Sequence, residues 1–139
     1  MRKIAIAIML VFITNIFASQ FNPIMQEYIN NLKTEAKKEN SGFVDFSIKE
    51  GEKIFTTSHI GKKSEKISCT SCHNIDLTTT GKNTFTNKLI EPLSPNKNPN
   101  RLTSVKDVEK WLRRNFKDVY NRAGTAQEKG DVLYYINSK

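Results

Sequence analysis

The two cysteines of this chain lie close together and a histidine follows the second, in the run Cys69-Thr70-Ser71-Cys72-His73. Thiols with this spacing add across the two vinyl groups of a protoporphyrin, and the adjoining imidazole can then bind its iron. The motif therefore predicts one covalently attached haem c per chain. Cys69 and Cys72 would be the attachment sites, and His73 the proximal iron ligand.

Other uses of these residues are open but weaker. A redox disulfide of the thioredoxin type normally follows a strand in a βαβ unit, and no alternating run precedes Cys69. Zinc would need four ligands, from His59, Cys69, Cys72 and His73. Adjacent residues such as Cys72 and His73 rarely both reach one tetrahedral ion. Chance is the third alternative, and the start of the chain argues against it.

Residues 1–19 have the features of an export signal. They give a positive start, an almost entirely apolar stretch over residues 4–17, and a small residue for cleavage at Ala18 or Ser19. A membrane anchor is the alternative, but the stretch is shorter than the ~20 residues of a bilayer crossing, and two polar residues interrupt it. We expect a cleaved signal peptide and a periplasmic protein. Bacteria attach c-type haem in that compartment, so leader and motif agree.

Removal of the leader leaves 120 residues, enough for one domain and too few for two. We expect a signal peptide over 1–19, an N-terminal helix within 20–45 and a haem domain over 46–139. The mature part has 20 basic and 14 acidic residues, a net charge of +6. Such a surface suits docking to an acidic protein. We expect no nucleic-acid partner, and membrane contact only through partners or an uncleaved leader.

Helical patterns dominate the remaining sequence, and no run predicts a strand convincingly. Asn22-Pro23 opens a first helix over residues 23–38, which ends near Ser41-Gly42. Three pairs of capping residues open further helices: Ser47 with Glu50, Ser104 with Asp107, and Thr125 with Glu128. Residues 78–103 are rich in Thr, Asn and Pro, which predicts either an ordered loop wrapped over a cofactor or a flexible one.

The order of helix, C-x-x-C-H, long loop and terminal helix resembles the cytochrome c fold. This resemblance implies an all-α, cytochrome c-like fold around one haem, with an extra N-terminal helix. In that fold the helix before the motif crosses the C-terminal helix at a contact of glycines and aromatic residues. Gly51 and Phe55 would then meet three residues of the last helix, namely Gly130, Leu133 and Tyr135.

The sixth iron ligand is not given by the C-x-x-C-H motif. Small cytochromes c usually place a methionine after the motif, but Met1, Met9 and Met25 all precede Cys69. The one other histidine, His59, is either a distal ligand or a polar residue at a helix end. Lysine, tyrosine and asparagine also remain open.

The region from Phe46 to the C-terminus resembles the sphaeroides haem protein family. This family of small exported cytochromes c is also catalogued as domain of unknown function 1924. The resemblance rests on the stretch 88–131, and above all on three motifs within it: Asn98-Pro99-x-Arg101, Val108-Glu109-Lys110-Trp111 and Arg114-Asn115.

In that family the distal ligand is an asparagine, and the matching position is Asn115. The resemblance thus implies a weak oxygen ligand that ferric iron tolerates and ferrous iron releases. We expect an electron carrier rather than an enzyme, and the resemblance suggests a dihaem cytochrome c or a membrane cytochrome b as redox partner. The alternative is a gas-reactive haem protein that binds nitric oxide or oxygen on reduction.

The chain departs from the family at one pair of positions. Family members often have a cysteine directly after this asparagine, bridged to another nearby, where Phe116 and Gly124 stand here. We therefore expect packing of Trp111, Leu112 and Phe116 to hold the distal helix instead.

Overall fold

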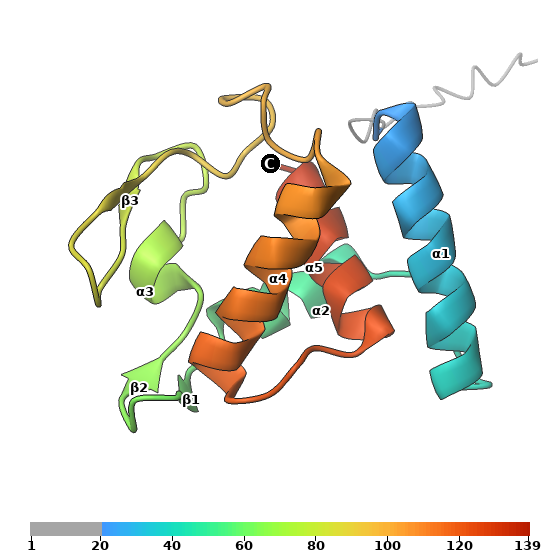
Figure 1. Ribbon diagram of the computed structural model, residues 1–139, viewed down its shortest axis with the longest axis horizontal. Helices are drawn as coiled ribbons and strands as arrows, with labels where there is room; N and C mark the ends of the chain where they lie inside the picture. Colours follow the sequence, from blue (N-terminus) through green and yellow to red (C-terminus); the bar gives the residue numbers. More distant parts are fainter. Residues whose placement is uncertain (1–20) are drawn as a thin grey trace, which may run out of the picture.

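The computed structural model describes residues 21–139, and its longer helices follow the predicted order (Figure 1). The helices in this range are α1 (Pro23–Glu39), α2 (Ile48–Thr56), the one-turn α3 (Thr70–His73), α4 (Val105–Tyr120) and α5 (Ala126–Asn137). The predicted leader over 1–19 lies outside the described residues. None of the helices described is long and apolar enough to cross a membrane.

Capping side chains determine where the four longer helices begin. Their N-caps are Asn22, Ser47, Ser104 and Thr125. Each side-chain oxygen accepts a hydrogen bond from the main-chain N–H three residues on, which satisfies a donor that the helix itself leaves unpaired. At α5 the Glu128 carboxylate also accepts from the main-chain N–H of Thr125, completing a capping box. These helix starts agree with the sequence prediction.

Helices α2 and α5 cross in extensive and close contact. Gly51 faces the backbone of α5, where any Cβ on residue 51 would overlap the carbonyl oxygen of Asp131. Phe55 packs beside Tyr135, with their ring centroids 5.4 Å apart. The predicted contact is confirmed for Gly51, Phe55 and Tyr135. A Cβ on Gly130 would meet the ring of Phe46.

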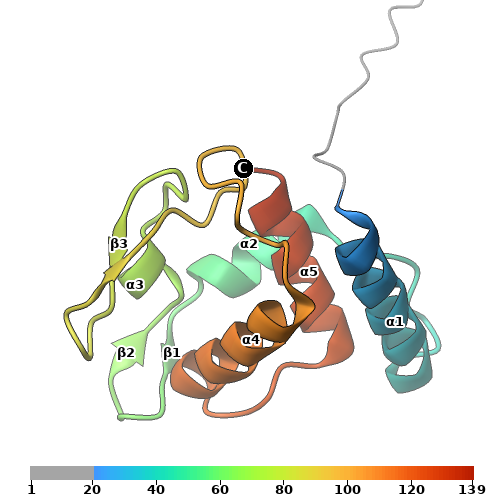
Figure 2. The same ribbon diagram turned by 45° about the horizontal axis from the view of Figure 1, so that its top comes forward.

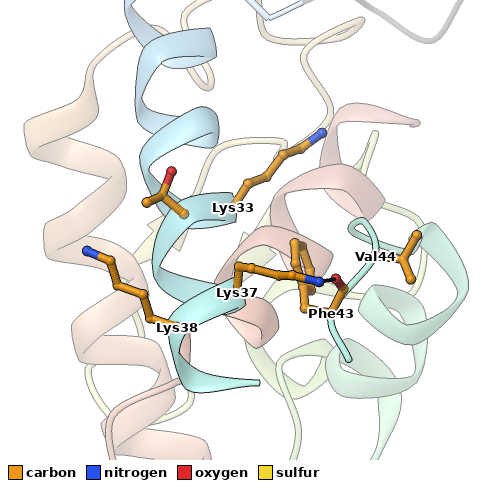
Figure 3. Close-up of a pocket in the computed structure, with 6 residues that line it drawn as sticks. Lys33, Lys37, Lys38, Phe43 and Val44 are labelled. Carbon is orange, nitrogen blue, oxygen red and sulfur yellow. Dashed lines mark hydrogen bonds between the residues drawn. The ribbon is translucent and has the colours of Figure 1, made fainter. Parts of the chain in front are cut away.

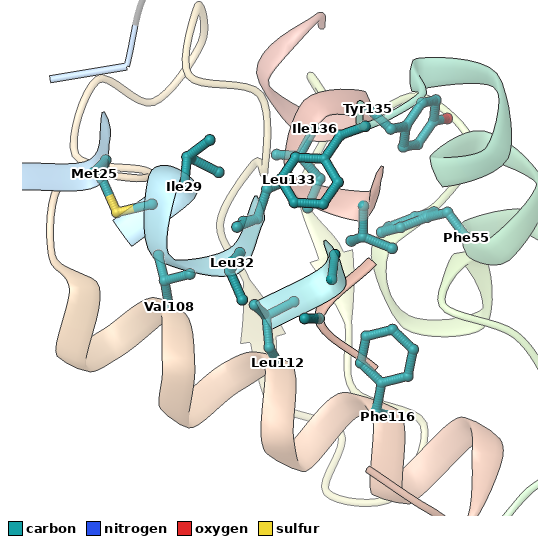
Figure 4. Close-up of a cluster of buried hydrophobic side chains, with 14 of the residues drawn as sticks. Met25, Ile29, Leu32, Phe55, Val108, Leu112, Phe116, Leu133, Tyr135 and Ile136 are labelled. Carbon is teal, nitrogen blue, oxygen red and sulfur yellow. The ribbon is translucent and has the colours of Figure 1, made fainter. Parts of the chain in front are cut away.

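Helix α1 packs along α5 and contacts α4 (Figures 1 and 4). Its buried residues join the main hydrophobic core and are Met25, Ile29, Leu32 and Ala36. Ile24, next to Met25 in the sequence, is 64% exposed. The carboxylate of Glu39 accepts a hydrogen bond from the N–H of Ala126, which ties the end of α1 to the start of α5.

Two short antiparallel hairpins lie on the side of the molecule away from α1 (Figure 2). The strand β1 (His59–Ile60) pairs with β2 (Lys66–Ile67), and β3 (Gly81–Lys82) pairs with β4 (Leu89–Ile90). The expectation of no strand was therefore wrong. Pairs of two residues carry no alternating pattern, so hydrogen bonds and tertiary contacts define them.

The segment 78–103 is an ordered loop that the rest of the fold holds in place. The N–H of Ser94 donates to the carbonyl of Leu77, and its hydroxyl donates to the main-chain oxygen of Lys139. Asn96 donates to the same oxygen at 2.9 Å. The loop thus joins the residues after α3 to the C-terminus.

Candidate functional site

A cavity of about 940 Å³ lies between α3, α4, α5 and the loop 83–104. Much of its wall is apolar, with side chains from α2, α4, α5 and the loop, among them Phe55, Leu93, Leu112, Phe116, Leu133 and Ile136. A site of this size and character suits a large, flat, mostly apolar group with a few polar contacts.

The short helix α3 brings the three residues of the predicted attachment motif to this cavity. Cys69 is its N-cap, and both Cys72 and His73 belong to its single turn. The two thiols are not joined in a disulfide. Burial raises the pKa of the Cys69 thiol to about 12, so this sulfur is a neutral thiol at pH 7 rather than a reactive thiolate. This state does not favour the redox-disulfide alternative.

The zinc alternative also lacks a site. No three histidine, cysteine, aspartate or glutamate side chains within residues 21–139 come together in a way that could hold a metal ion. His59, the fourth candidate ligand, does not line the cavity.

His73 has the properties of an iron ligand. Its Nδ1 is the one buried side-chain nitrogen or oxygen of the described residues without a hydrogen bond. Burial, and then the positive charge of Arg101, lower the pKa of His73 to about 4. The imidazole is therefore neutral at pH 7, the form in which histidine binds metals.

Asn115 also lines this cavity, from the middle of α4. Its side-chain amide makes no hydrogen bond with the described residues, although the residue is only partly exposed. Trp111, one turn earlier, is 45% exposed and lies under Lys110 and Arg114. The expectation that Trp111 helps to hold the helix was wrong, because Leu112 and Phe116 are the buried residues of this turn.

The other candidate ligands lie elsewhere. The ring of His59 packs on Tyr120 with centroids 4.2 Å apart, and Tyr120 rather than His59 lines the cavity. The Tyr120 hydroxyl donates to the carbonyl of Ile54 at 2.7 Å. Met25 is fully buried in the core beneath α1 (Figure 4). Met1 and Met9 fall outside the described residues.

Arg101 is a cavity residue whose role the sequence did not indicate. It entered only as part of the Asn98-Pro99-x-Arg101 motif. In the structure it lines the cavity, and its charge acts on His73. The signal that could have found it is a single arginine in a loop otherwise rich in Pro and Asn.

A second concavity, of about 530 Å³, lies between α1 and the loop 40–47 (Figure 3). Two of its three lysines already have partners in the protein: Lys37 donates to the carbonyls of Ser41 and Phe43, and Lys33 pairs with Asp45. It contains none of the predicted site residues. We therefore assign the chemistry to the larger cavity.

Comparison with known proteins gives one family and two characterised relatives. The family model "Domain of unknown function (DUF1924)" matches residues 41–136. The chain is 42% identical over 86 residues to cytochrome c-type protein SHP of Cereibacter sphaeroides, covering 62% of this chain and 66% of that protein. It is 29% identical over 90 residues to cytochrome c'' of Methylophilus methylotrophus, covering 65% and 62%. These matches span slightly less than two thirds of each relative's length.

The fold is similar to solved structures of the same two proteins. Oxidised SHP, described as an oxygen-binding cytochrome c, aligns with a TM-score of 0.70 and 33% identity, over 81% of this chain and 94% of that chain. Oxidised cytochrome c'' aligns with a TM-score of 0.71 and 25% identity, over 81% and 91%.

Fold and site together define a small c-type cytochrome with covalently attached haem c. The chain belongs to the DUF1924 family, as its sequence motifs predicted. The residues present fit the cofactor, because a haem-sized cavity, two free thiols and a buried ring nitrogen without a hydrogen bond occur together.

Proposed function

We propose that this protein is an exported monohaem cytochrome that carries single electrons between redox proteins, with Asn115 as a weak distal ligand. Cys69 and Cys72 attach the haem, and His73 is the proximal ligand. Each thiol adds across a vinyl group: sulfur bonds to one carbon and the thiol hydrogen goes to the other, so attachment needs no oxidant. When bound, the haem supplies one-electron chemistry at its iron.

The observation that carries this proposal is that His73 and Asn115 line the same cavity. The Nδ1 of His73 and the side-chain amide of Asn115 both lack a hydrogen bond with the described residues. If His73 and Asn115 both held the ferric iron, no position would remain for a substrate, which would favour an electron carrier over an enzyme. An amide oxygen is a weak ligand, so it is readily lost from ferrous iron.

We further propose a periplasmic location and partners with acidic docking surfaces. The location rests on the signal-like pattern of residues 1–19 and on the haem-attachment motif. The net charge of +6 after removal of that leader favours acidic redox partners. A dihaem cytochrome c or a membrane cytochrome b, which the family resemblance implies, would fill this role.

Gas binding is the second candidate function. It is supported by the weak ligand proposed above and by the similarity to SHP, whose solved structure is described as that of an oxygen-binding cytochrome c. In this function Asn115 would release the iron on reduction, and its side of the cavity would then be open to nitric oxide or oxygen.

An absorption spectrum of the purified exported protein distinguishes the two functions. It is recorded in the ferric state, after dithionite reduction, and after addition of carbon monoxide. A low-spin ferrous spectrum that does not change when carbon monoxide is added means a strong sixth ligand and favours a simple electron carrier. A high-spin ferrous spectrum that shifts with the gas means that the ligand leaves and favours gas binding. The absence of any haem spectrum would refute both.

A further inference from the structure

Arg101 is a half-buried cation on the wall of the haem cavity. Its Nε donates to the carbonyl of Pro92 and its Nη2 to the carbonyl of Glu91, each at 2.8 Å. Arginine has five N–H donors, so the remaining three have no partner within residues 21–139. The guanidinium is thus fixed in position and still has free donors.

No carboxylate of the described chain forms an ion pair with Arg101. The Glu91 carboxylate accepts a hydrogen bond from the Asn98 amide at 3.4 Å, and its charge acts on Arg101 only from beyond ion-pair distance. A partly desolvated cation is costly unless an anion compensates it, and a guanidinium fork matches a carboxylate with two parallel hydrogen bonds. The site therefore has the chemistry to bind a carboxylate that the protein itself does not supply.

We propose that Arg101 binds a propionate carboxylate of the haem. The proposal rests on the haem lying in this cavity. The other cations on the cavity wall are less suited to this role: Arg114 is exposed and stacks over Trp111 at 5.1 Å, and Lys88 is exposed. Arg101 alone among these three is held by two backbone carbonyls.

Binding of the propionate has two electrostatic consequences. A fixed positive charge beside the haem disfavours the more positive ferric state, so it raises the midpoint potential. It also favours the ionised propionate, so it lowers the propionate pKa. The midpoint potential falls with rising pH over the range in which that propionate loses its proton. Because Arg101 lowers the propionate pKa, this pH range lies lower than it would without Arg101.

The experiment measures the midpoint potential of the haem-loaded protein from pH 4 to 9 in wild type, Arg101→Gln, Arg101→Lys and Arg114→Gln. Arg114→Gln removes the same charge from the same cavity wall and is the matched control. We expect Arg101→Gln to lower the potential more than Arg114→Gln and to move the pH-dependent range upward. Arg101→Lys should shift both quantities in the same direction by less, because it keeps the charge and loses the fork.

A purely structural role gives a different result. If Arg101 only closes the loop, both Arg101 variants lose thermal stability. The potential and pH profile of Arg101→Gln then match those of Arg114→Gln, and those of Arg101→Lys match wild type, which overturns the proposal. If Arg101→Gln does not accumulate with haem, Arg101→Lys provides the test. A wild-type potential and pH profile in Arg101→Lys would overturn the proposal. Mass spectrometry of the wild type separately tests whether haem is attached, so failure of the proposed function is distinguishable.

Discussion

The ring of Phe116 occupies the space that a side chain on residue 124 would need, since a Cβ on Gly124 would lie 2.8 Å from the ring. Phe116 is 4% exposed and Gly124 is buried. These are the two positions where family members often have bridged cysteines. A ring packed on a glycine thus joins helix α4 to the segment before α5 in this chain.

Gly124→Ala should force the Phe116 ring out of position and destabilise the folded protein by about 1–3 kcal/mol. Phe116→Ala removes the contact and leaves a cavity, which should cost about 3–5 kcal/mol. Denaturant unfolding of the haem-loaded variants checks both values. Wild-type stability in Gly124→Ala would contradict the close packing of the Phe116 ring against residue 124.

Gly51→Ala should weaken the crossing of α2 and α5, because its Cβ would overlap the carbonyl of Asp131 on rigid helical backbone. We expect a loss of about 2 kcal/mol or more in the free energy of unfolding. Gly42→Ala is the control, since its Cβ would meet only the side chain of Asn40, at 3.3 Å. Equal stability of the two variants would contradict the close approach.

Glu128 should make the stability depend on pH. Its hydrogen bonds to Arg122 hold the pKa of its carboxyl below the ordinary value of 4.5. The stabilisation is therefore complete above pH 4.5 and is lost as the pH falls through the lowered pKa. Because the pair is partly exposed, we expect about 1 kcal/mol or less.

Denaturant unfolding of Glu128→Gln between pH 3 and 7 measures this contribution. The variant should be less stable than wild type at pH 7 and should converge with it at pH 3. Glu65→Gln is the matched control, since the Glu65 side chain has no ion pair or hydrogen bond with the described residues. A difference between wild type and Glu128→Gln that grows toward low pH would contradict a lowered carboxyl pKa in the folded protein.

Replacement of the two cysteines tests the attachment of the haem. Cys69→Ala with Cys72→Ala should give a protein from which haem is lost completely under denaturing conditions, because no thioether remains. Each single variant should retain one bond. Mass spectrometry of the denatured chain measures this, and haem retained by the double variant would contradict the assignment of both residues.

Helix starts could be predicted from the sequence because local hydrogen bonds determine them. The family could be predicted because its motifs are short runs of neighbouring residues. Ser47, Ser104 and Thr125 cap helices through hydrogen bonds within three residues, which the sequence alone specifies. The C-x-x-C-H turn is equally local.

Several features that depend on tertiary contacts were not predicted. Periodicity places Trp111 on the apolar face of α4, but it lies at the cavity rim and is 45% exposed. The β1–β2 hairpin is fixed by contacts such as the hydrogen bond from the N–H of Lys62 to the carbonyl of Asp118, far along the chain. For the same reason the position of Arg101 became apparent only in the folded chain.

The ferric absorption spectrum of Asn115→Ala, compared with His59→Ala, tests the proposed iron site most directly. Asn115 lines the cavity and His59 does not, so Asn115→Ala should change the ferric spectrum and His59→Ala should leave it unchanged. Both variants should keep covalent haem. An unchanged spectrum in Asn115→Ala, or a changed one in His59→Ala alone, would contradict asparagine ligation.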